Sequence, residues 1–397
     1  MSERHHFPEE LLIEVLKRLP VGSLVRFTAV SKSLFFFITS PAFASAHLRH
    51  SRCNDNSSRN LLLHRRVRYP SRKRKCEILC ESDHQTLTPI SSPELPLSIP
   101  DGDGILIMVG CCNGVVCLLY NRHSGSESIY LWNPCIQKLM TLPSAAIIRP
   151  WCFSVLGFGV DPEGGLKVVR VVHERETGWI RSVSDHVEIY SLGTGTWRRI
   201  SVVGVNPCEI ILVQSQTFVH GAVHWIGSKL MDDNARQYCI IVFSMSDEVF
   251  SEIMLPDELA CAGSGFSKDL RMVTFGESVV VYWQTVGMDG LSFELWMMKE
   301  YGVVGSWCRL HRMEPVEWAA EVVGLRKNGD VFISTDDEED GELVSYCPDT
   351  GAVSKLGIYG SDFIFHVFEY LESLVLLQEQ SCVIDGISEE MTSLALI

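Results

Sequence analysis

Long hydrophobic runs and an excess of positive charge are both missing from this sequence. No stretch reaches the roughly 18 apolar residues that a membrane-spanning helix needs, so we expect no membrane insertion. The 34 Lys and Arg residues are outnumbered by 49 Asp and Glu residues, which gives a formal net charge of −15. That balance argues against a nucleic-acid partner, because such partners require a basic surface that displaces counterions.

Ordered cysteine and catalytic motifs are also lacking. The 14 cysteines contain no C-x-x-C pair, so their spacing supports neither a zinc site nor a disulfide framework. Four glutamates interrupt the first 20 residues, which disfavours a secretory signal, and we expect reduced thiols in the cytoplasm or nucleus. G-x-S-x-G, P-loop and H-E-x-x-H motifs do not occur. We therefore predict a protein without a cofactor, a metal site or catalytic residues.

The sequence is nevertheless long enough, at 397 residues, for two domains or one large repeat fold. Helical spacing of apolar residues is confined to residues 7–48. The pattern predicts three helices: one that Pro8 opens and Pro20 ends, a second that carries Leu24, and a third that stops before Pro41. The apolar positions of the first helix are Leu11, Leu12, Val15, Leu16 and Leu19.

This helical segment has more apolar surface than it can bury alone. Phe35, Phe36 and Phe37 are consecutive, and consecutive residues of a helix cannot all face one small core. Part of the surface must therefore contact something else. Two interpretations remain open: the helices form a cap that packs on the chain's own larger domain, or they dock on another protein.

Residues 1–50 resemble an F-box. The resemblance rests on Phe7-Pro8, Glu9-Glu10, Leu11-Leu12, Val15-Leu16, Leu19-Pro20, Leu24, Val30 and Lys32. The sequence departs from the family pattern at Phe7, Ser31 and Leu34. An F-box implies binding to a Skp-type adaptor, which bridges to cullin and RING subunits. By this resemblance the adaptor-binding residues are Phe7, Pro8, Leu11, Leu12, Val15, Leu16, Leu19, Pro20, Leu24 and Val30.

A different pattern begins after residues 51–59, which we interpret as a linker because Asn, Asp and Ser dominate there. Short β-type runs alternate with turn residues, and strand-ending aromatics recur every 50 to 58 residues: Trp132, Tyr190, Phe243, Trp296 and Tyr346. Seven residues after four of them comes another large apolar residue. After Trp296 the equivalent residue is Trp307, so this turn contains a four-residue insertion.

A period near fifty with paired strands predicts an all-β, kelch-like propeller over residues 60–380, followed by a C-terminal tail at 381–397. Five units fit within residues 105–358. Strands at 60–69 and 75–81, joined by two more at 362–377, would complete a sixth blade. Pairing the two ends of the chain in one blade closes the ring and removes exposed strand edges. We therefore predict six blades.

The propeller region resembles the F-box-associated domain of plant F-box proteins of the F-box/kelch-repeat type. The segments that carry this resemblance include residues 110–120, 131–143, 187–200, 218–226 and 242–256. It implies a non-catalytic receptor of a Skp-cullin-F-box ubiquitin ligase that delivers an unknown protein substrate for degradation. One branch of the family restrains immune receptors, which suggests a role in plant defence or signalling. A non-degradative scaffold and a propeller enzyme are the alternatives.

Three further features have ordinary structural explanations beside functional ones. His220 and His224 are four residues apart on an expected strand, too distant to share a metal. The basic run between Arg65 and Lys75 is a solvated loop between two strands, a nuclear-import signal or a patch for an acidic partner. The acidic run from Asp336 to Asp340 is either a solvated hairpin or a lip that contacts a basic substrate.

Overall fold

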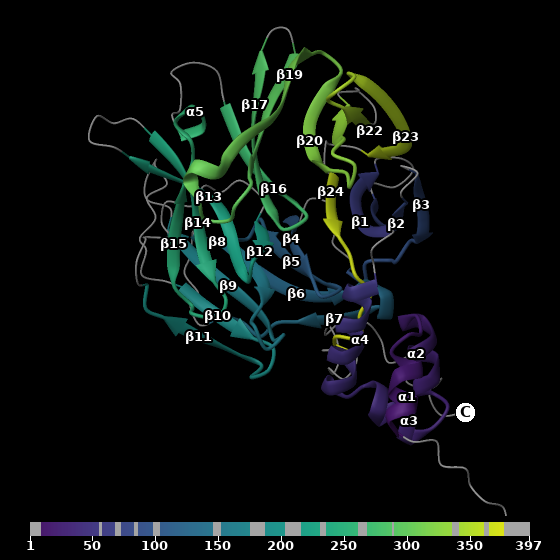
Figure 1. Cartoon of the computed structure of the whole chain (residues 1–397). Helices are drawn as coiled ribbons and strands as arrows, with labels where there is room; N and C mark the ends of the chain where they lie inside the picture. Colours follow the sequence, from purple (N-terminus) through teal and green to yellow (C-terminus); the bar gives the residue numbers. More distant parts are fainter. Residues whose placement is uncertain are drawn as a thin grey trace, which may run out of the picture.

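A ring of six four-stranded sheets with a helical domain on one side makes up the protein (Figure 1). The computed structural model describes residues 9–376, apart from 55–57, 68–72, 83–85, 98–103, 146–151, 175–186, 203–215, 231–235, 261–267, 288–289, 336–340 and 361–364. No helix within these residues is long and apolar enough to cross a membrane. The predicted architecture, a helical unit followed by a six-bladed propeller, is confirmed.

The helical domain contains four helices where the sequence predicted three. The first three lie where expected: α1 (Glu9–Leu16), α2 (Val21–Thr28) and α3 (Lys32–Ile38). The fourth, α4 (Pro41–Asn54), begins at the proline before which the sequence predicts a helix end. Proline is well suited to the first turn of a helix, where its missing N–H is not needed. Ser40 caps this turn, because its Oγ accepts a hydrogen bond from the Phe43 N–H at 3.2 Å.

Helix α4 also corrects the expected linker at 51–59. The helix runs to Asn54 and strand β1 begins at Ser58, so only residues 55–57, which lie outside the described part, separate the two elements. The polar residues at the end of this helix have the composition that is also typical of a flexible connection.

Each blade is an antiparallel sheet of four strands that follow one another from the ring centre outwards. Blade 1 contains β24 (Phe365–Glu369), β1 (Ser58–Val67), β2 (Lys73–Ser82) and β3 (Leu87–Ser91). Blade 2 contains β4 (Gly104–Cys112), β5 (Val115–Arg122), β6 (Glu127–Asn133) and β7 (Lys138–Thr141). Blade 3 contains β8 (Cys152–Val160), β9 (Leu166–Glu174), β10 (Val187–Ser191) and β11 (Thr196–Ile200).

The remaining three blades follow the same plan. Blade 4 contains β12 (Thr217–Val219), β13 (Ala222–Leu230), β14 (Arg236–Ser244) and β15 (Phe250–Met254), followed by the short helix α5 (Asp257–Ala260). Blade 5 contains β16 (Lys268–Phe275), β17 (Ser278–Gly287), β18 (Gly290–Met298) and β19 (Trp307–Val316). Blade 6 contains β20 (Ala319–Leu325), β21 (Val331–Thr335), β22 (Gly341–Cys347) and β23 (Ala352–Gly360).

The ring closes in blade 1, where the two ends of the chain share a sheet. Strand β1 pairs with β2 on one side and with β24 on the other, as the strand arithmetic predicted. The second strand expected near the end of the chain is absent from the described residues. Residues 370–376 instead form an irregular segment, which we call the strap, and it runs towards the helical domain.

The repeated aromatics mark the ends of third strands, and their seven-residue spacing is a cross-strand pairing. The paired residues are Trp132 and Leu139, Tyr190 and Trp197, Phe243 and Phe250, and Tyr346 and Val353. In blade 5 the insertion shifts the register, so that Trp307 pairs with Met298 instead. The sequence period is thus the repeat of one hairpin per blade.

Tryptophan side chains tie consecutive blades together. The indole N–H of Trp197 in blade 3 donates to the Pro143 carbonyl at 2.8 Å, and that of Trp307 in blade 5 donates to the Met254 carbonyl at 3.2 Å. Apolar clusters fill the spaces between blades. Each sheet therefore buries both of its faces, which a single blade alone does not achieve.

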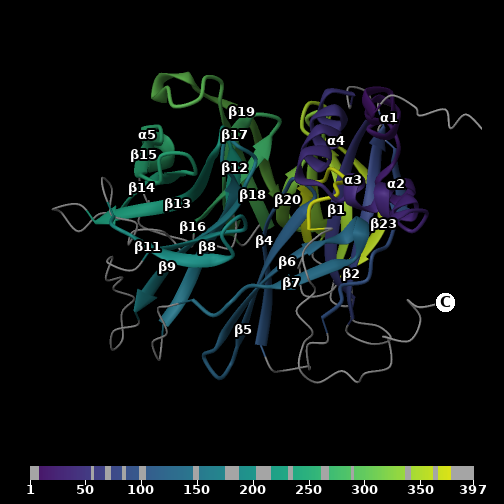
Figure 2. The same ribbon diagram turned by 90° about the horizontal axis from the view of Figure 1, so that it is seen from below.

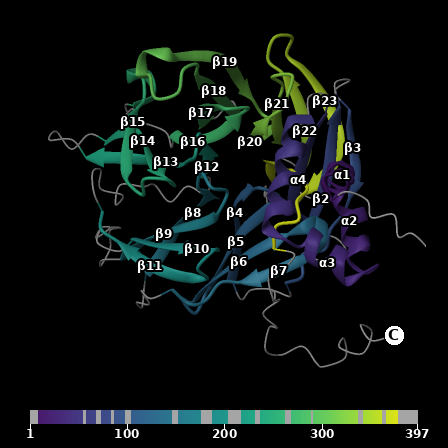
Figure 3. The same cartoon turned by 60° about the horizontal axis from the view of Figure 1, so that its bottom comes forward.

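The helical domain occupies only one side of the ring (Figures 2 and 3). Strands alternate in direction, so the turns after the first and third strands of every blade lie on one side, and the other connections lie on the opposite side. Helix α4 enters β1 from the first of these sides, which we call the helix side.

Candidate functional site

Exposed apolar side chains concentrate on the helical domain. Fourteen large apolar side chains are exposed among the described residues, and six belong to this small domain: Leu11, Val15, Phe27, Val30, Phe35 and Phe36. Single exposed apolar residues are ordinary on soluble proteins, but several on one small domain are typical of an interaction site. We call these six residues the apolar helix surface.

The predicted adaptor-binding residues divide into two groups. Leu11, Val15 and Val30 are more than half exposed, and Pro20 is also exposed. Leu16 and Leu24 are buried at 4% and 0% exposure and form the domain's own core, and half-buried Leu12 and Leu19 pack against that core. Phe7 and Pro8 lie outside the described residues. The adaptor contact remains a prediction, and within the described residues the first group is the more accessible one.

The run of three phenylalanines splits in the same way. Phe35 and Phe36 point outward, with their rings in an edge-to-face contact at 5.6 Å, whereas Phe37 packs on Phe43 at 4.9 Å. Sequence reasoning identified the excess of apolar surface but did not include Phe27, Phe35 or Phe36 among the site residues. The signal was present in the run itself, because consecutive helical positions face different directions.

The helical domain is packed on the propeller, as the first of the two interpretations of its excess apolar surface predicted. Leu374 of the strap is 2% exposed and lies in the helical core beside Leu16, Leu24 and Phe43. Ile136, in the 3₁₀ turn η1 (Pro134–Ile136) of blade 2, packs against the same cluster. The sharp change in sequence pattern near residue 50 therefore separates two domains that share a core.

Asn133 fixes the strap against blade 2. Its side-chain amide is fully buried and donates to the carbonyls of Ser373 at 3.0 Å and Val375 at 2.8 Å. Ser373 in turn donates from its hydroxyl to the Asn113 carbonyl at 2.6 Å. Gly114 leaves room for the strap, since a Cβ there would stand 2.3 Å from the Leu371 carbonyl oxygen. The strap is thus a specific connection between the two domains.

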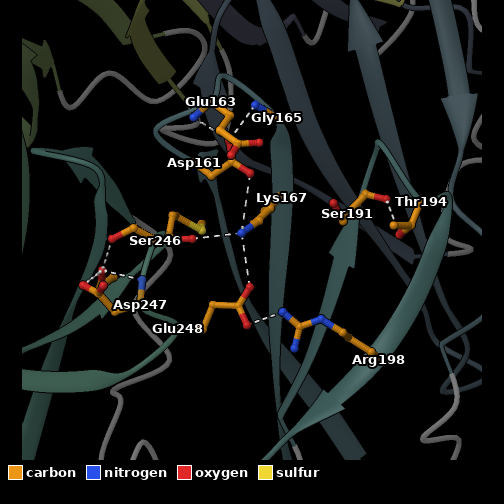
Figure 4. A network of polar contacts seen from close by, with 12 residues as sticks. Asp161, Glu163, Gly165, Lys167, Ser191, Thr194, Arg198, Ser246, Asp247 and Glu248 are labelled. Carbon is orange, nitrogen blue, oxygen red and sulfur yellow. Dashed lines mark hydrogen bonds and ion pairs between the residues drawn. The ribbon is translucent and has the colours of Figure 1, made fainter.

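A network of charged side chains joins the turns of blades 3 and 4 on the helix side (Figure 4). The ammonium group of Lys167 lies 3.1 Å from Glu248 and 3.5 Å from Asp161, and it donates to the Met245 carbonyl at 3.0 Å. Glu248 also binds Arg198. Burial alone would raise the pKa of Glu248, but its bonds to Arg198 and Lys167 lower the pKa below its ordinary value. The network holds these turns in place.

The centre of the ring contains a cavity of about 260 Å³ lined by the innermost strands. Its charged lining residues form pairs: Arg59 binds Glu369 at 2.8 Å, and Arg271 binds Glu321. No group of three His, Cys, Asp or Glu residues with metal-binding geometry occurs in the described part of the chain. His220 and His224, whose spacing had raised the question of a metal pair, both contact the Tyr301 ring instead.

A pair of histidines, of which His64 is buried and His366 is half-buried, gives the propeller a predictable response to acid. His64 in β1 and His366 in β24 are cross-strand partners whose rings stack at 5.7 Å in the sheet that closes the ring. Burial lowers the pKa of His64 to about 3, with further lowering from His366 and Arg74. Burial likewise lowers the pKa of His366 to about 4, aided by Arg271. Both imidazoles are therefore neutral in the folded protein near neutral pH.

We expect the melting temperature of the protein to fall as the pH drops below about 6.5, the ordinary histidine pKa. The unfolded chain binds these protons at a higher pH than the folded one, so stability is complete above that value and decreases below it. Each histidine contributes up to about 1.4 kcal/mol per pH unit in this range. Thermal melts of the parent and of a His64→Phe/His366→Phe variant check this expectation. The variant keeps two aromatic rings but should have a shallower slope, and an equal slope would contradict the assignment.

Comparisons with known proteins match each of the two domains to a protein family. A family model described as the F-box associated beta propeller domain matches residues 79–377, and an F-box domain model matches residues 5–45. The chain belongs to the F-box-associated β-propeller family. The F-box and the propeller that its sequence predicted are thereby confirmed.

Relatives of this F-box protein are found in Arabidopsis thaliana. The F-box/kelch-repeat protein At3g23880 is 27% identical over 325 residues, which cover 78% of this chain and 80% of the relative. The F-box protein At3g07870 is 25% identical over 414 residues, with 92% and 91% covered. The expectation of a plant-type F-box protein is therefore confirmed. Among solved structures, the similarity to the Aleuria aurantia lectin covers 78% of this chain and 98% of that protein at 12% identity, with a TM-score of 0.40.

Proposed function

We propose that this F-box protein is the substrate-recognition subunit of a Skp-cullin-F-box ubiquitin ligase. In this arrangement the helical domain binds a Skp-type adaptor, the adaptor bridges to cullin and RING subunits, and the propeller holds a target protein. The observation that carries the proposal is the apolar helix surface, which stays exposed although the same domain buries other apolar residues on the propeller. The family match supports it, since an F-box domain implies an adaptor of this kind.

The proposed role requires no catalysis by this chain. A receptor accelerates ubiquitin transfer by raising the effective concentration of the target near the conjugating enzyme. That effect depends on a fixed distance between the two binding surfaces, and a flexible connection would weaken it. The shared core around Leu374 and the bonds from Asn133 to the strap supply such a fixed geometry. We place this activity in the cytoplasm or nucleus.

Replacing Val15 by Asp is expected to weaken adaptor binding by at least about tenfold, because a carboxylate at the centre of an apolar contact loses its hydration. Val15 is 57% exposed, so the substitution should leave the melting temperature unchanged. Binding of the purified protein to a Skp-type adaptor, measured by calorimetry, checks the expectation. Leu16→Asp is unsuitable for this test, because Leu16 is a core residue whose substitution would unfold the domain.

Ile105→Asp is a matched control, since Ile105 is 56% exposed but lies on β4 of the propeller. Adaptor binding that survives Val15→Asp and Phe36→Asp equally well would reject the apolar helix surface as the contact. The degradative role has a separate readout, which is the half-life of proteins that purify with the chain in the presence and absence of a proteasome inhibitor. Bound partners whose half-life does not change would favour the scaffold alternative.

A further inference from the structure

One loop of blade 5 differs from its counterparts in the other blades. Residues 299–306 join β18 to β19 with eight residues, whereas the equivalent turns of the other blades have four or five. The four-residue insertion seen in the sequence after Trp296 is this extension. The loop lies on the helix side of the ring, because it follows a third strand. Neither the blade repeat nor the adaptor contact accounts for the added residues.

Hydrogen bonds hold the 299–306 loop in one shape. Ser306 accepts from the Glu300 N–H at 3.0 Å with its hydroxyl oxygen and donates to the Glu300 carbonyl at 2.9 Å. The Gly302 N–H donates to the Met298 sulfur at 3.0 Å. The loop ends in a 3₁₀ turn, η3 (Val304–Ser306). An extended surface loop that is bonded in this way is pre-organised.

Tyr301 fastens the loop to blade 4. Its hydroxyl lies 2.7 Å from Nε2 of His224, whose Nδ1 is 3.3 Å from the Thr217 carbonyl. Since Nδ1 carries the proton that this carbonyl accepts, Nε2 is the acceptor and the tyrosine hydroxyl is the donor. The Tyr301 ring also packs on the His220 ring at 4.4 Å. His220 and His224 therefore hold this loop against blade 4.

The loop and the neighbouring turn of blade 4 expose apolar side chains. Eight large apolar side chains are exposed among the described propeller residues, and half of them lie on this loop and turn: Val249, Tyr301, Val303 and Val304. The side chains of Val303 and Val304 are 43% and 44% exposed. Apolar residues held outward on a rigid loop are typical of the central part of an interaction surface.

Acidic residues predominate among the exposed charges on the turns of this part of the ring. The turns of blades 3, 4 and 5 on the helix side carry four exposed carboxylates, on Glu163, Asp247, Glu277 and Glu300, and one exposed ammonium group, on Lys299. The network around Lys167 and Glu248 keeps the blade 3 and blade 4 turns in position (Figure 4). A surface that combines exposed aliphatic side chains with an excess of carboxylates is complementary to a segment that combines an aliphatic side chain with basic residues.

We propose that this edge, formed by residues 299–306 and the adjoining turns of blades 3 and 4, binds a short segment of the target protein in which Lys or Arg flank an aliphatic side chain. The proposal rests on the proposed receptor function and names the class of segment that the receptor recognises. The edge and the helical domain lie on the same side of the ring (Figure 3). A target bound there would face the side from which the adaptor and its ligase partners extend.

Selection of a displayed library of random short peptides against the purified full chain in complex with its adaptor tests the proposal. We expect enrichment of peptides with basic residues on both sides of a Val, Leu or Ile. Synthetic copies of these peptides should bind at least about tenfold more weakly to a Val303→Asp/Val304→Asp variant. Glu277→Lys/Glu300→Lys should also weaken binding and reduce its dependence on salt.

Val353→Asp is the matched control, because Val353 is 45% exposed and lies near the start of the fourth strand of blade 6, where the preceding turn is short. This variant should bind the peptides as the parent does. Selection of no peptide, of peptides without the basic and aliphatic pattern, or of peptides that tolerate Val303→Asp/Val304→Asp would each overturn the proposal. Adaptor binding is measured on the same samples, so the receptor function can stand while this surface is rejected.

Discussion

Glu81→Gln is expected to lower the free energy of unfolding by about 3–5 kcal/mol. The Glu81 carboxylate is 2% exposed and lies 3.0 Å from Arg59 and 2.8 Å from Arg326, which is also 2% exposed. The neutral amide keeps the shape of the carboxylate but leaves two guanidinium groups without their shared counter-charge. Removing one partner of a buried ion pair costs much more folding free energy than the intact pair contributes, because the remaining charge is left buried and unpaired.

Because of the position of this cluster, the loss of stability in Glu81→Gln should affect the whole propeller. Glu81 is on β2 and Arg59 on β1 of blade 1, whereas Arg326 directly follows β20 of blade 6. Arg59 also donates to the Leu325 carbonyl of blade 6 at 2.9 Å. The cluster therefore spans the junction at which the last complete blade meets the blade that joins the two chain ends. A propeller depends on this junction because an open ring exposes strand edges and apolar faces.

Glu369→Gln provides the control for Glu81→Gln. Glu369 binds the same Arg59 at 2.8 Å, but its side chain is 50% exposed, so its removal should cost less than about 1 kcal/mol. Denaturant unfolding followed by tryptophan fluorescence measures both variants. Equal effects of the two substitutions would contradict a central role for Glu81 in closing the ring.

The sequence predicted the features that repeat along the chain or that depend on residues close together in sequence. The aromatic residues every fifty positions marked third strands, because each blade solves the same packing problem with the same hairpin. Trp307 revealed the enlarged loop of blade 5 through its spacing alone. Helix α4 was missed because Pro41 fits both the end of one helix and the first turn of another, and only the Ser40 cap decides between them.

Contacts between distant segments left no such signal. Leu11 and Leu16 belong to one broad apolar stripe of α1, yet one is 53% exposed and the other is in the core. Periodicity shows that a helix has an apolar side but not which part of that side its own domain covers. The partner that covers Leu16 includes Leu374, more than 350 residues away along the chain. No local pattern connects these two positions.

Leu374→Ala is expected to destabilise the helical domain by about 2–5 kcal/mol, because Leu374 is a buried member of a small core that has few other residues to fill the cavity. Amide hydrogen exchange in α2, α3 and α4 should accelerate, and adaptor binding should weaken as the folded fraction falls. By the same reasoning, a fragment that ends at residue 58 lacks the strap and should show little stable helix. The linker predicted at residues 51–59 gave no sign of this dependence.

Leu376→Ala separates this effect from general damage to the strap. Leu376 is two residues further along, is 5% exposed and carries the same side chain, but it packs in the cluster between blades 2 and 3. This variant should accelerate exchange in β5 and β9 while the helices keep their protection. The reverse pattern is expected for Leu374→Ala. If both variants expose the same amides, or if the helices stay protected without Leu374, the two domains do not share a core and the fixed geometry between adaptor and target is lost as an explanation.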